Sequence, residues 1–541
     1  MTKSWWKEAV IYQIYPRSFL DTNGDGIGDL QGIIQKLDYL KALGVDVLWL
    51  NPIFRSPNDD NGYDISDYRD IMLEFGNMAD FGQLLAGVHD RGMKLLMDLV
   101  VNHSSDEHPW FEASKDPDSP YRDYYFWQDQ KPNNWQSIFG GDAWTWSEEG
   151  QGYYLHQFTT KQPDLNWENP KLREEVYALM RFWLDKGIDG FRMDVIPFIS
   201  KDLPFRDAPE NSRWEEVYAN GPRIHEFLQE MYREALAPYD VMTVGEGPGI
   251  TPDNILEYVG EDRGELNMIF HFGHMFLDFG PGGRFDPKPW KLSELKQVVQ
   301  DWDEGVSTKG WINIFLDNHD FSRLVSRFGN DQEYRVASAK LLATMILTLR
   351  GTPCIYQGSE IGMTNVAFPA LSDYRDVEIM NAWKAWDAAG KDLDQLLKAV
   401  HRQGRDNVRT PMQWDDTLQA GFTNGEPWIG VNPNYPEINV ARALEDPSSI
   451  YYYYKHFLQF RKAHPVFVYG SYEPLLSDSE TWFAYRRKDD KEDILVILNF
   501  SDFPQEFPLP DLLQGRECLI TNYYGQNGDG PFKPWEGRVL R

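Results

Sequence analysis

The sequence predicts an α/β fold: a (β/α)8 TIM barrel with a small domain inserted after strand 3 and a C-terminal antiparallel β-sandwich domain. Short apolar runs alternate with segments of helical period over most of the 541 residues. Several of these runs are apolar on both faces, as strands are when a barrel interior covers one side and helices cover the other. Eight strands that alternate with helices through right-handed connections close into a barrel more readily than they form an open sheet of this length.

Eight runs have the length and composition of barrel strands. They are Val10–Tyr15, Val47–Leu50, Lys94–Val101, Gly190–Asp194, Val241–Glu246, Met268–Phe272, Trp311–Leu316 and Cys354–Tyr356. The amphipathic segments between them predict the helices Leu30–Leu43, Met78–Arg91, Pro170–Lys186, Pro222–Leu236, Leu292–Asp303 and Gln332–Leu349. The third of these helices is well delimited, because Asn169 can cap it, Pro170 suits its first position and Gly187 can end it.

The alternation is interrupted at three places, which sets the expected domains. Residues 104–167 are irregular and rich in Trp, Asn, Gly and Asp, so we expect them to form the inserted domain. Residues 366–400 have a helical pattern and predict a second insertion, after strand eight. From His464 the chain becomes strand-like with turns, which predicts a C-terminal β domain of residues 464–541. The barrel then comprises residues 1–103 and 168–463.

Composition excludes several classes of function. With 84 Asp and Glu against 53 Lys and Arg, the net charge is −31, which repels phosphate backbones and anionic lipid. We therefore expect no nucleic-acid partner and no membrane partner. The most apolar stretch, Leu341–Leu349, is far shorter than the ~20 residues that span a bilayer. Two distant cysteines, Cys354 and Cys518, and an N-terminal MTKSWWKEAV without an apolar signal core favour a cytoplasmic protein. We expect a monomer or a simple homo-oligomer, and no organic cofactor.

Charged residues gather where the barrel strands end, which is where this fold carries its chemistry. These residues are Asp98 and His103 after strand three, Arg192 and Asp194 in strand four, Glu246 in strand five, and His319 and Asp320 after strand seven. Four carboxylates without a surplus of His or Cys argue against a zinc site and a thiol nucleophile. They match acetal cleavage, in which one carboxylate attacks the anomeric carbon and a second carboxyl group gives its proton to the leaving oxygen. Arg192 can keep Asp194 ionised, and Glu246 should have a raised pKa.

Four sequence blocks carry a resemblance to a known family. The blocks are DLVVNH (Asp98–His103), GFRMDV (Gly190–Val195), VGE (Val244–Glu246) and NHD (Asn318–Asp320). They are similar to the signature regions of the α-amylase superfamily of glycoside hydrolases. The opening WWKEAVIYQIYPRSF and the segment GRDNVRTPMQWDD also match, so the similarity extends over essentially the whole chain. It is closest to the oligo-1,6-glucosidases and dextran glucosidases.

The resemblance implies a role for each residue of the rim. Asp194 would be the nucleophile that forms a β-glucosyl-enzyme, and Glu246 the general acid and then base. Asp320 would be the third carboxylate, which grips sugar hydroxyls and helps to distort the ring. The pocket for the terminal glucose would be completed by His103, Arg192 and His319.

The resemblance also implies how one end of the site is closed. In NDDNGYD, Asp60 matches the family carboxylate that binds the non-reducing-end hydroxyl, and Tyr63 matches the stacking platform. Arg405 matches the arginine that pairs with this carboxylate. An Asp60–Arg405 pair would turn the site into a pocket, and the enzyme would then act from chain ends.

Bond preference is implied by Val195, which follows the nucleophile and matches the α-1,6-preferring members, whereas maltose-preferring relatives usually have Thr there. QPDLNW (Gln162–Trp167) also resembles the oligo-1,6-glucosidase form of its motif. The chain departs from the family pattern at Gly247, where a side chain is usual. We expect its loss to widen or empty the leaving-group site, which leaves the preferred chain length open.

A candidate metal loop lies at DTNGDGIGD. Oxygens alternate around glycines as in the first part of a calcium loop, but Ile33 stands near the position of the bidentate Glu, so the loop is not an EF-hand. An acidic, glycine-rich turn is the alternative. The resemblance implies a structural Ca²⁺, with Mg²⁺ as the other candidate ion. The ligands would be Asp21, Asn23, Asp25, the Ile27 carbonyl and Asp29.

The leading hypothesis is a retaining exo-α-glucosidase that hydrolyses α-1,6 bonds of isomaltose and short isomalto-oligosaccharides, its small α-glucoside partners. One alternative keeps the chemistry and changes the acceptor: a sucrose isomerase or sucrose-active glucosyl transferase, or an α-glucosidase with α-1,4 activity. Sucrose isomerases carry an Arg-rich loop where this chain reads GRFDPKPW (Gly283–Trp290). A second alternative, a non-enzymatic transporter heavy chain, would have a membrane-spanning helix and usually lacks the full carboxylate set.

Overall fold

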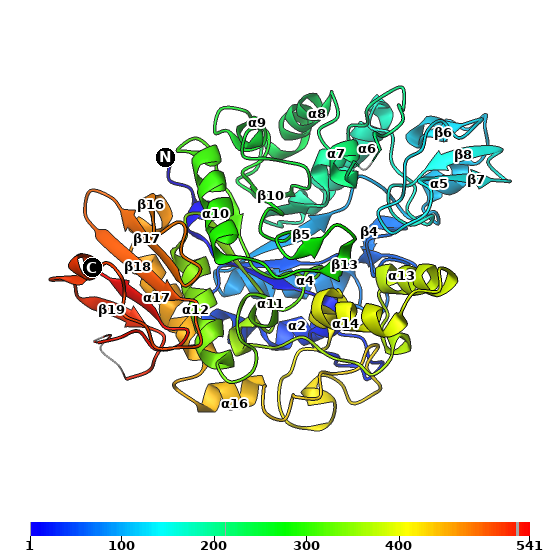
Figure 1. Cartoon of the computed structure of the whole chain (residues 1–541). Coiled ribbons are helices and arrows are strands. Elements are labelled where there is room, and N and C mark those ends of the chain that lie inside the picture. Colours follow the sequence, from blue (N-terminus) through cyan, green and yellow to red (C-terminus); the bar gives the residue numbers. More distant parts are fainter. Residues whose placement is uncertain (1, 211, 526–527, 529) are drawn as a thin grey trace.

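The computed structural model describes residues 2–210, 212–525, 528 and 530–541. Its centre is a parallel eight-stranded sheet with the order β11-β10-β9-β5-β2-β1-β15-β14. A parallel bridge between Ile269 and Ile312 joins the two edge strands and closes the barrel. All eight predicted barrel strands are confirmed (Figure 1). Their bounds are β1 Ile11–Ile14, β2 Val47–Leu50, β5 Lys94–Leu99, β9 Gly190–Met193, β10 Met242–Glu246, β11 Met268–Phe270, β14 Asn313–Ile314 and β15 Thr352–Tyr356.

Helices follow the strands as the sequence predicts. They are α2 Leu30–Gln35 with α3 Leu37–Leu43, α4 Met78–Asp90, α6 Pro170–Asp185, α8 Ile224–Met231 with η4 Tyr232–Leu236, α10 Leu292–Val306 and α12 Arg335–Thr348. The segment predicted as one helix from Leu30 to Leu43 is two, because Lys36 leaves the helical conformation with φ −103° and ψ 6°. The cap of α6 is as expected, with the Asn169 side chain accepting the N–H of Lys171.

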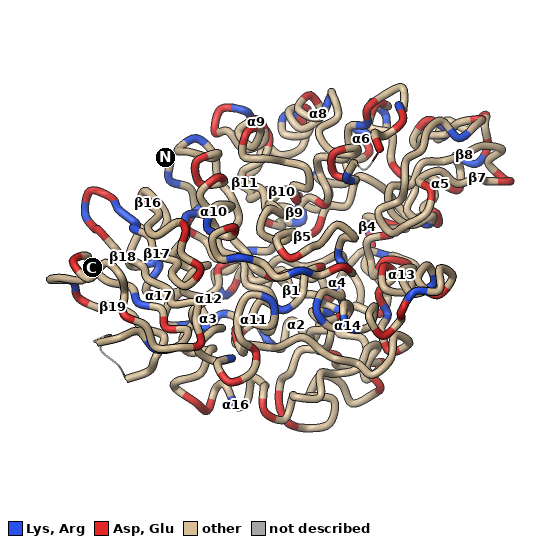
Figure 2. Tube along the Cα trace, in the orientation of Figure 1, with Lys and Arg blue, Asp and Glu red and all other residues tan. Residues whose placement is uncertain are grey.

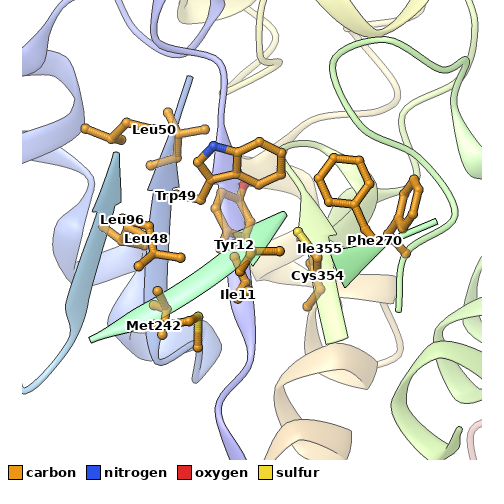
Figure 3. Close-up of a cluster of buried hydrophobic side chains, with 14 of the residues drawn as sticks. Ile11, Tyr12, Leu48, Trp49, Leu50, Leu96, Met242, Phe270, Cys354 and Ile355 are labelled. Atoms are coloured by element: carbon orange, nitrogen blue, oxygen red, sulfur yellow. The ribbon is translucent and has the colours of Figure 1, made fainter. Parts of the chain in front are cut away.

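The barrel strands are buried on both faces, which explains their continuous apolar runs. Figure 3 shows side chains from β1, β2, β5, β10, β11 and β15 packed together in this core. Helix α12 is also enclosed, since every residue from Ser338 to Thr348 is buried. This burial explains why α12 contains the most apolar stretch of the sequence. Among the described residues, no helix is long and apolar enough to cross a membrane.

Between β5 and α6 the chain forms a small antiparallel sheet with the order β6-β8-β7, made of Trp127–Gln128, Gly152–Leu155 and Trp144–Ser147, preceded by helix α5 Pro109–Ser114. A fully buried lysine ties this region to the barrel. Lys201 Nζ lies 2.6 Å from Asp164 Oδ2 and donates to Asn102 Oδ1 (2.7 Å) and to the Phe198 carbonyl (2.8 Å). After β15 the chain forms the second, helical insertion, with α13 Val377–Ala388 and α14 Leu393–Gln403.

The C-terminal region is a five-stranded antiparallel sheet with the order β16-β17-β18-β20-β19. Its strands are Ser471–Leu475, Trp482–Lys488, Asp493–Asn499, Gly537–Leu540 and Cys518–Thr521. Alternate side chains face opposite ways: Phe483 and Val496 join the main core, while Trp482 and Ile497 pack with Phe532 on the other face. The described residues form one sheet and not the two of the predicted sandwich, because loop side chains supply the second layer.

The two smaller sheets lie on opposite sides of the barrel, with the C-terminal sheet on the left and β6, β7 and β8 on the right in Figure 1. Acidic and basic segments alternate over most of the trace in Figure 2, so the excess of negative charge is spread over the molecule.

Candidate active site

One buried arginine organises the carboxylates at the barrel rim. Arg192 lies in β9 beside β5, where Asp98 is its partner in register, and beside β10, which ends with Glu246. Its Nη1 donates to Asp98 Oδ1 (2.6 Å) and to Asp194 Oδ1 (2.7 Å). Its Nη2 forms an ion pair of 2.6 Å with Glu246 Oε2. A planar guanidinium offers N–H groups in fixed directions, so one side chain sets the mutual position of three carboxylates.

The backbone just after Asp194 is strained, and it also holds Glu246 in position relative to Asp194. Val195 has φ 32° and ψ 43°, a left-handed conformation that β-branched residues rarely adopt. Such a conformation costs about 1–3 kcal/mol and persists only when surrounding contacts hold it. Here the Val195 N–H donates to Glu246 Oε2 at 3.0 Å. The strained turn therefore links the residue after Asp194 directly to the second carboxylate.

Burial raises the proton affinity of both carboxylates. It raises the pKa of Asp194 to about 7, against the lowering effect of Arg192. It raises the pKa of Glu246 to about 8, where Arg192 again opposes it and the charges of Asp194 and Asp320 add to it. Arg192 donates a hydrogen bond to Asp194, which favours the ionised form of that carboxylate, and the neighbouring negative charges favour a proton on Glu246, as suits a nucleophile beside an acid.

The third carboxylate has the opposite environment. Asp320 Oδ1 lies 2.8 Å from Arg409 Nη2 and 3.4 Å from Arg405 Nη1, and its Oδ2 lies 3.3 Å from His319 Nε2. Burial opposes ionisation, but His319 and the two arginines hold the pKa of Asp320 below its usual range. Asp320 is therefore a permanently ionised group that can accept hydrogen bonds from a ligand.

The two predicted histidines are neutral and fixed in position. Burial lowers the pKa of His319 and of His103 to about 3. The His319 ring stacks on Tyr63 at 5.3 Å and 8°, with its Nε2 at 2.8 Å from the Tyr63 hydroxyl. His103 Nε2 lies 3.2 Å from the Tyr63 carbonyl and 3.2 Å from Gln162 Nε2. Tyr63 is thus held between both histidines, with its hydroxyl also donating to Asp98 Oδ2 at 3.0 Å.

The far end of the site contains the expected ion pair. Arg405 Nη2 lies 3.5 Å from Asp60 Oδ1, and Gln162 Nε2 donates to Asp60 Oδ2 at 3.3 Å. Burial raises the pKa of Asp60 to about 7. Arg405 makes a closer pair with Asp376, a residue that the sequence had not indicated. Both members of the Asp60–Arg405 pair are buried and line the same cavity.

These groups surround a pocket of about 750 Å³. Of the predicted residues, Asp60, Tyr63, His103, Asp194, Val195, Glu246, Asp320 and Arg405 line it. Arg192 and His319 lie behind and act through their contacts with Asp194, Glu246, Tyr63 and Asp320. The wall also contains six phenylalanines that the sequence did not single out: Phe139, Phe158, Phe272, Phe276, Phe279 and Phe321. The pocket therefore combines a charged interior with aromatic walls, as sugar rings require.

Other site residues were missed for different reasons. Arg409 follows Arg405 by four residues in a short helical turn, α15 Asp406–Arg409, so its spacing within GRDNVRT was a usable signal. Asp376 and Glu378 lie in the helical insertion, where no local pattern marks them. The expectation for Gly247 is wrong: a Cβ there would meet Ile269 Cδ1 at 3.0 Å, Ile250 Cδ1 at 3.1 Å and the Phe270 carbonyl at 3.3 Å. The missing side chain relieves core packing and does not widen the pocket.

The candidate calcium loop is shaped by its own N–H groups. Asp21 Oδ1 accepts from Asn23 and Gly24, and its Oδ2 accepts from Gly26. Asp29 caps α2 through the N–H of Gly32 (2.7 Å). In the described part of the chain, no three His, Cys, Asp or Glu side chains are grouped to hold a metal ion. The predicted ligand set also includes the Asn23 side chain and the Ile27 carbonyl, which are not among these residue types, so bound calcium stays an untested prediction.

Comparisons with known proteins agree with this geometry. The model of the alpha amylase catalytic domain matches residues 13–470. The chain belongs to the α-amylase family. It is 56% identical to an oligo-1,6-glucosidase of Parageobacillus thermoglucosidasius over 100% of this chain and 99% of the relative. It is 48% identical to a trehalose-6-phosphate hydrolase of Bacillus subtilis, over 99% and 98% of the two chains.

Solved structures give the same fold. The crystal structure of the isomaltulose synthase of Klebsiella sp. LX3 superposes with a TM-score of 0.97 at 47% identity and covers 100% of both chains. The family and the glucosidase relative identify the chain as a glycoside hydrolase, and the structural match confirms the (β/α)8 barrel.

Proposed function

We propose that the chain is a retaining, exo-acting α-glucosidase that releases glucose from the non-reducing ends of isomaltose and short isomalto-oligosaccharides. The observation that carries the proposal is the placement of Asp194 and Glu246 on one guanidinium, Arg192, in a pocket whose end is closed by Asp60 and Arg405. A closed end beside the reacting carboxylates leaves room for a terminal sugar and excludes the interior of a chain.

The contacts indicate which oxygen of each carboxylate reacts. Asp194 Oδ1 is held by Arg192, which leaves Oδ2 to attack the anomeric carbon. Glu246 Oε2 is held by Arg192 and by the Val195 N–H, which leaves Oε1 to carry the proton. As the bond from Asp194 to the anomeric carbon forms, the Glu246 proton passes to the glycosidic oxygen, which leaves with the bonding electron pair.

The second step reverses the roles. Glu246, now ionised, takes a proton from water, and the water oxygen attacks the anomeric carbon and displaces the Asp194 carboxylate. Two inversions at one carbon give α-glucose. Throughout both steps, the ionised Asp320, which Arg409 holds from behind, offers acceptors for the hydroxyls of the bound ring, and Arg405 offers donors.

The α-1,6 preference is supported by Val195 and by the relatives. Val195 lines the pocket beside Asp194. Its apolar side chain can pack against the leaving sugar but cannot form a hydrogen bond with it. A relative at 56% identity over the full chain is named an oligo-1,6-glucosidase. Both observations favour isomaltose over maltose as the substrate.

The test is glucose release from isomaltose, isomaltotriose and maltose by the wild type and by Asp194→Ala. We expect the highest kcat/KM on the α-1,6 substrates, α-glucose as the first anomer seen by NMR, and no release by the variant. Early β-glucose would contradict the retaining mechanism. Undiminished release by a folded Asp194→Ala protein would contradict the assignment of the nucleophile.

Sucrose isomerisation is the second candidate, favoured by the full-length likeness to an isomaltulose synthase. Phe272, Phe276 and Phe279 line the pocket, and in this reaction they would retain the leaving sugar long enough for it to attack the intermediate. Incubation with sucrose separates the two reactions. A hydrolase gives glucose and fructose, whereas predominant isomaltulose or trehalulose would assign the chain to the isomerases.

A further inference from the structure

Asp376 is a buried carboxylate that lies behind the closed end of the pocket. Its side chain is fully buried and does not line the cavity. It stands directly before α13 in the helical insertion and caps that helix, because its Oδ1 accepts the N–H of Glu378 at 3.0 Å. Helix capping alone does not require burial, since Asp392 caps α14 in the same insertion while it is exposed.

Asp376 occupies one edge of the Arg405 guanidinium. Arg405 Nε lies 3.0 Å from both carboxylate oxygens, and Nη2 also pairs with Oδ1. The other directions of the same guanidinium point into the pocket, with Nη2 toward Asp60 (3.5 Å) and Nη1 toward Asp320 (3.4 Å). Because the group is planar and its N–H directions are fixed, a partner on one edge determines where the remaining N–H groups point.

The pocket acids alone would not keep Arg405 in this orientation. Their distances to Arg405 are nearly equal, 3.4 Å for Asp320, 3.5 Å for Asp60 and 3.7 Å for Glu378. Asp320 is already paired with Arg409 at 2.8 Å. A guanidinium without its edge partner could turn toward any of these carboxylates, and each turn would change the spacing between Asp60 and Arg405.

We propose that Asp376 is a positioning residue that holds Arg405 in place and thereby keeps the pocket closed at the non-reducing end. It acts on recognition of the terminal glucose and connects the helical insertion to that recognition. The inference rests on the proposed exo-glucosidase function. It assigns a role in substrate selection to a residue that does not contact the substrate.

The experiment compares Asp376→Asn with the matched control Asp392→Asn. Both variants remove a charge from a helix cap of the same insertion, but only the first removes the partner of Arg405. Two substrates are used: isomaltose, and an α-glucoside oligosaccharide whose terminal glucose is blocked at O4 and O6 by an ethylidene group. Asp376→Ser keeps a capping oxygen and removes the arginine partner, so it replaces the asparagine variant if that one does not fold.

We expect Asp376→Asn to raise KM for isomaltose about tenfold or more, with a smaller change in kcat, because a buried arginine loses its partner. We also expect it to cleave the blocked substrate, which the wild type and Asp392→Asn should leave intact. In an Arg405→Lys background, Asp376→Asn should change KM less than about twofold, since the two residues then act as one unit.

Three outcomes would overturn the inference: KM of Asp376→Asn within error of Asp392→Asn, no cleavage of the blocked substrate, or independent effects of Asp376 and Arg405. A wild type that releases no glucose from isomaltose would instead contradict the proposed function.

Discussion

The role of Arg192 gives the sharpest prediction, because this one side chain faces Asp98, Asp194 and Glu246. Replacing it with Gln keeps much of its bulk and removes the charge. At about 4 Å and an effective dielectric constant of about 20, one charge stabilises a carboxylate by about 4 kcal/mol, which changes its dissociation constant about a thousandfold. The pKa of Asp194, about 7 in the native protein, would then rise well into the alkaline range.

The sign of the effect follows from the proton that each step needs. Asp194 must be ionised and Glu246 protonated, so the wild-type kcat/KM should rise through about pH 7 and fall above about pH 8. In Arg192→Gln, about one Asp194 in a thousand is ionised at neutral pH. Because the pKa of Glu246 rises as well, activity should keep increasing by about tenfold per pH unit in the range where the wild type declines.

The assay is kcat/KM on isomaltose from pH 5 to pH 10, with folding checked by circular dichroism at each pH. Arg173→Gln is the matched control, since Arg173 is a buried arginine that pairs with Glu230 outside the pocket. Arg192→Lys should recover part of the neutral activity. A pH profile of wild-type shape, lowered by one factor at every pH, would refute the electrostatic argument and leave Arg192 a purely geometric role.

Three further predictions concern separate parts of the molecule. Glu246→Gln should lower kcat about 10²–10⁴-fold on isomaltose and much less on a dinitrophenyl glucoside, whose leaving group needs no proton; equal losses on both would contradict the acid assignment. Lys201→Met should lower the free energy of unfolding by about 3–5 kcal/mol in urea titrations, because Asp164 would keep a buried charge without its partner, and an unchanged midpoint would contradict this. If the DTNGDGIGD loop binds calcium, EDTA should lower Tm and calcium should restore it, and Asp25→Ala should remove both effects.

The barrel could be predicted because its strands are buried on both faces. Continuous apolar runs such as Val47–Leu50 then differ from the amphipathic helices around them, and the alternation identifies the fold. The meeting of the rim carboxylates could be predicted for a related reason. Parallel strands end at the same rim, so Asp194 and Glu246 meet although they lie 52 positions apart in the sequence.

What could not be predicted depends on packing between distant segments. Asp376 acquires its role from Arg405, and nothing near either residue in the sequence indicates the contact. The effect of Gly247 depends on the direction of a missing Cβ, which points toward Ile269 in the core. The outer face of the C-terminal sheet is covered by loop residues such as Phe507 and Phe532. These loops have no strand pattern, so the sequence does not indicate that they form the second layer of the domain.

Under the proposed function, the closed end at Asp60 and Arg405 would impose an order on product departure. Glucose would form at the closed end, so the shortened oligosaccharide, which would lie nearer the mouth of the pocket, would have to diffuse away first. The enzyme would therefore release the shortened oligosaccharide after every cleavage and bind a new chain for the next one. Such a catalyst is distributive, and it trims a population of chains evenly instead of consuming one molecule at a time.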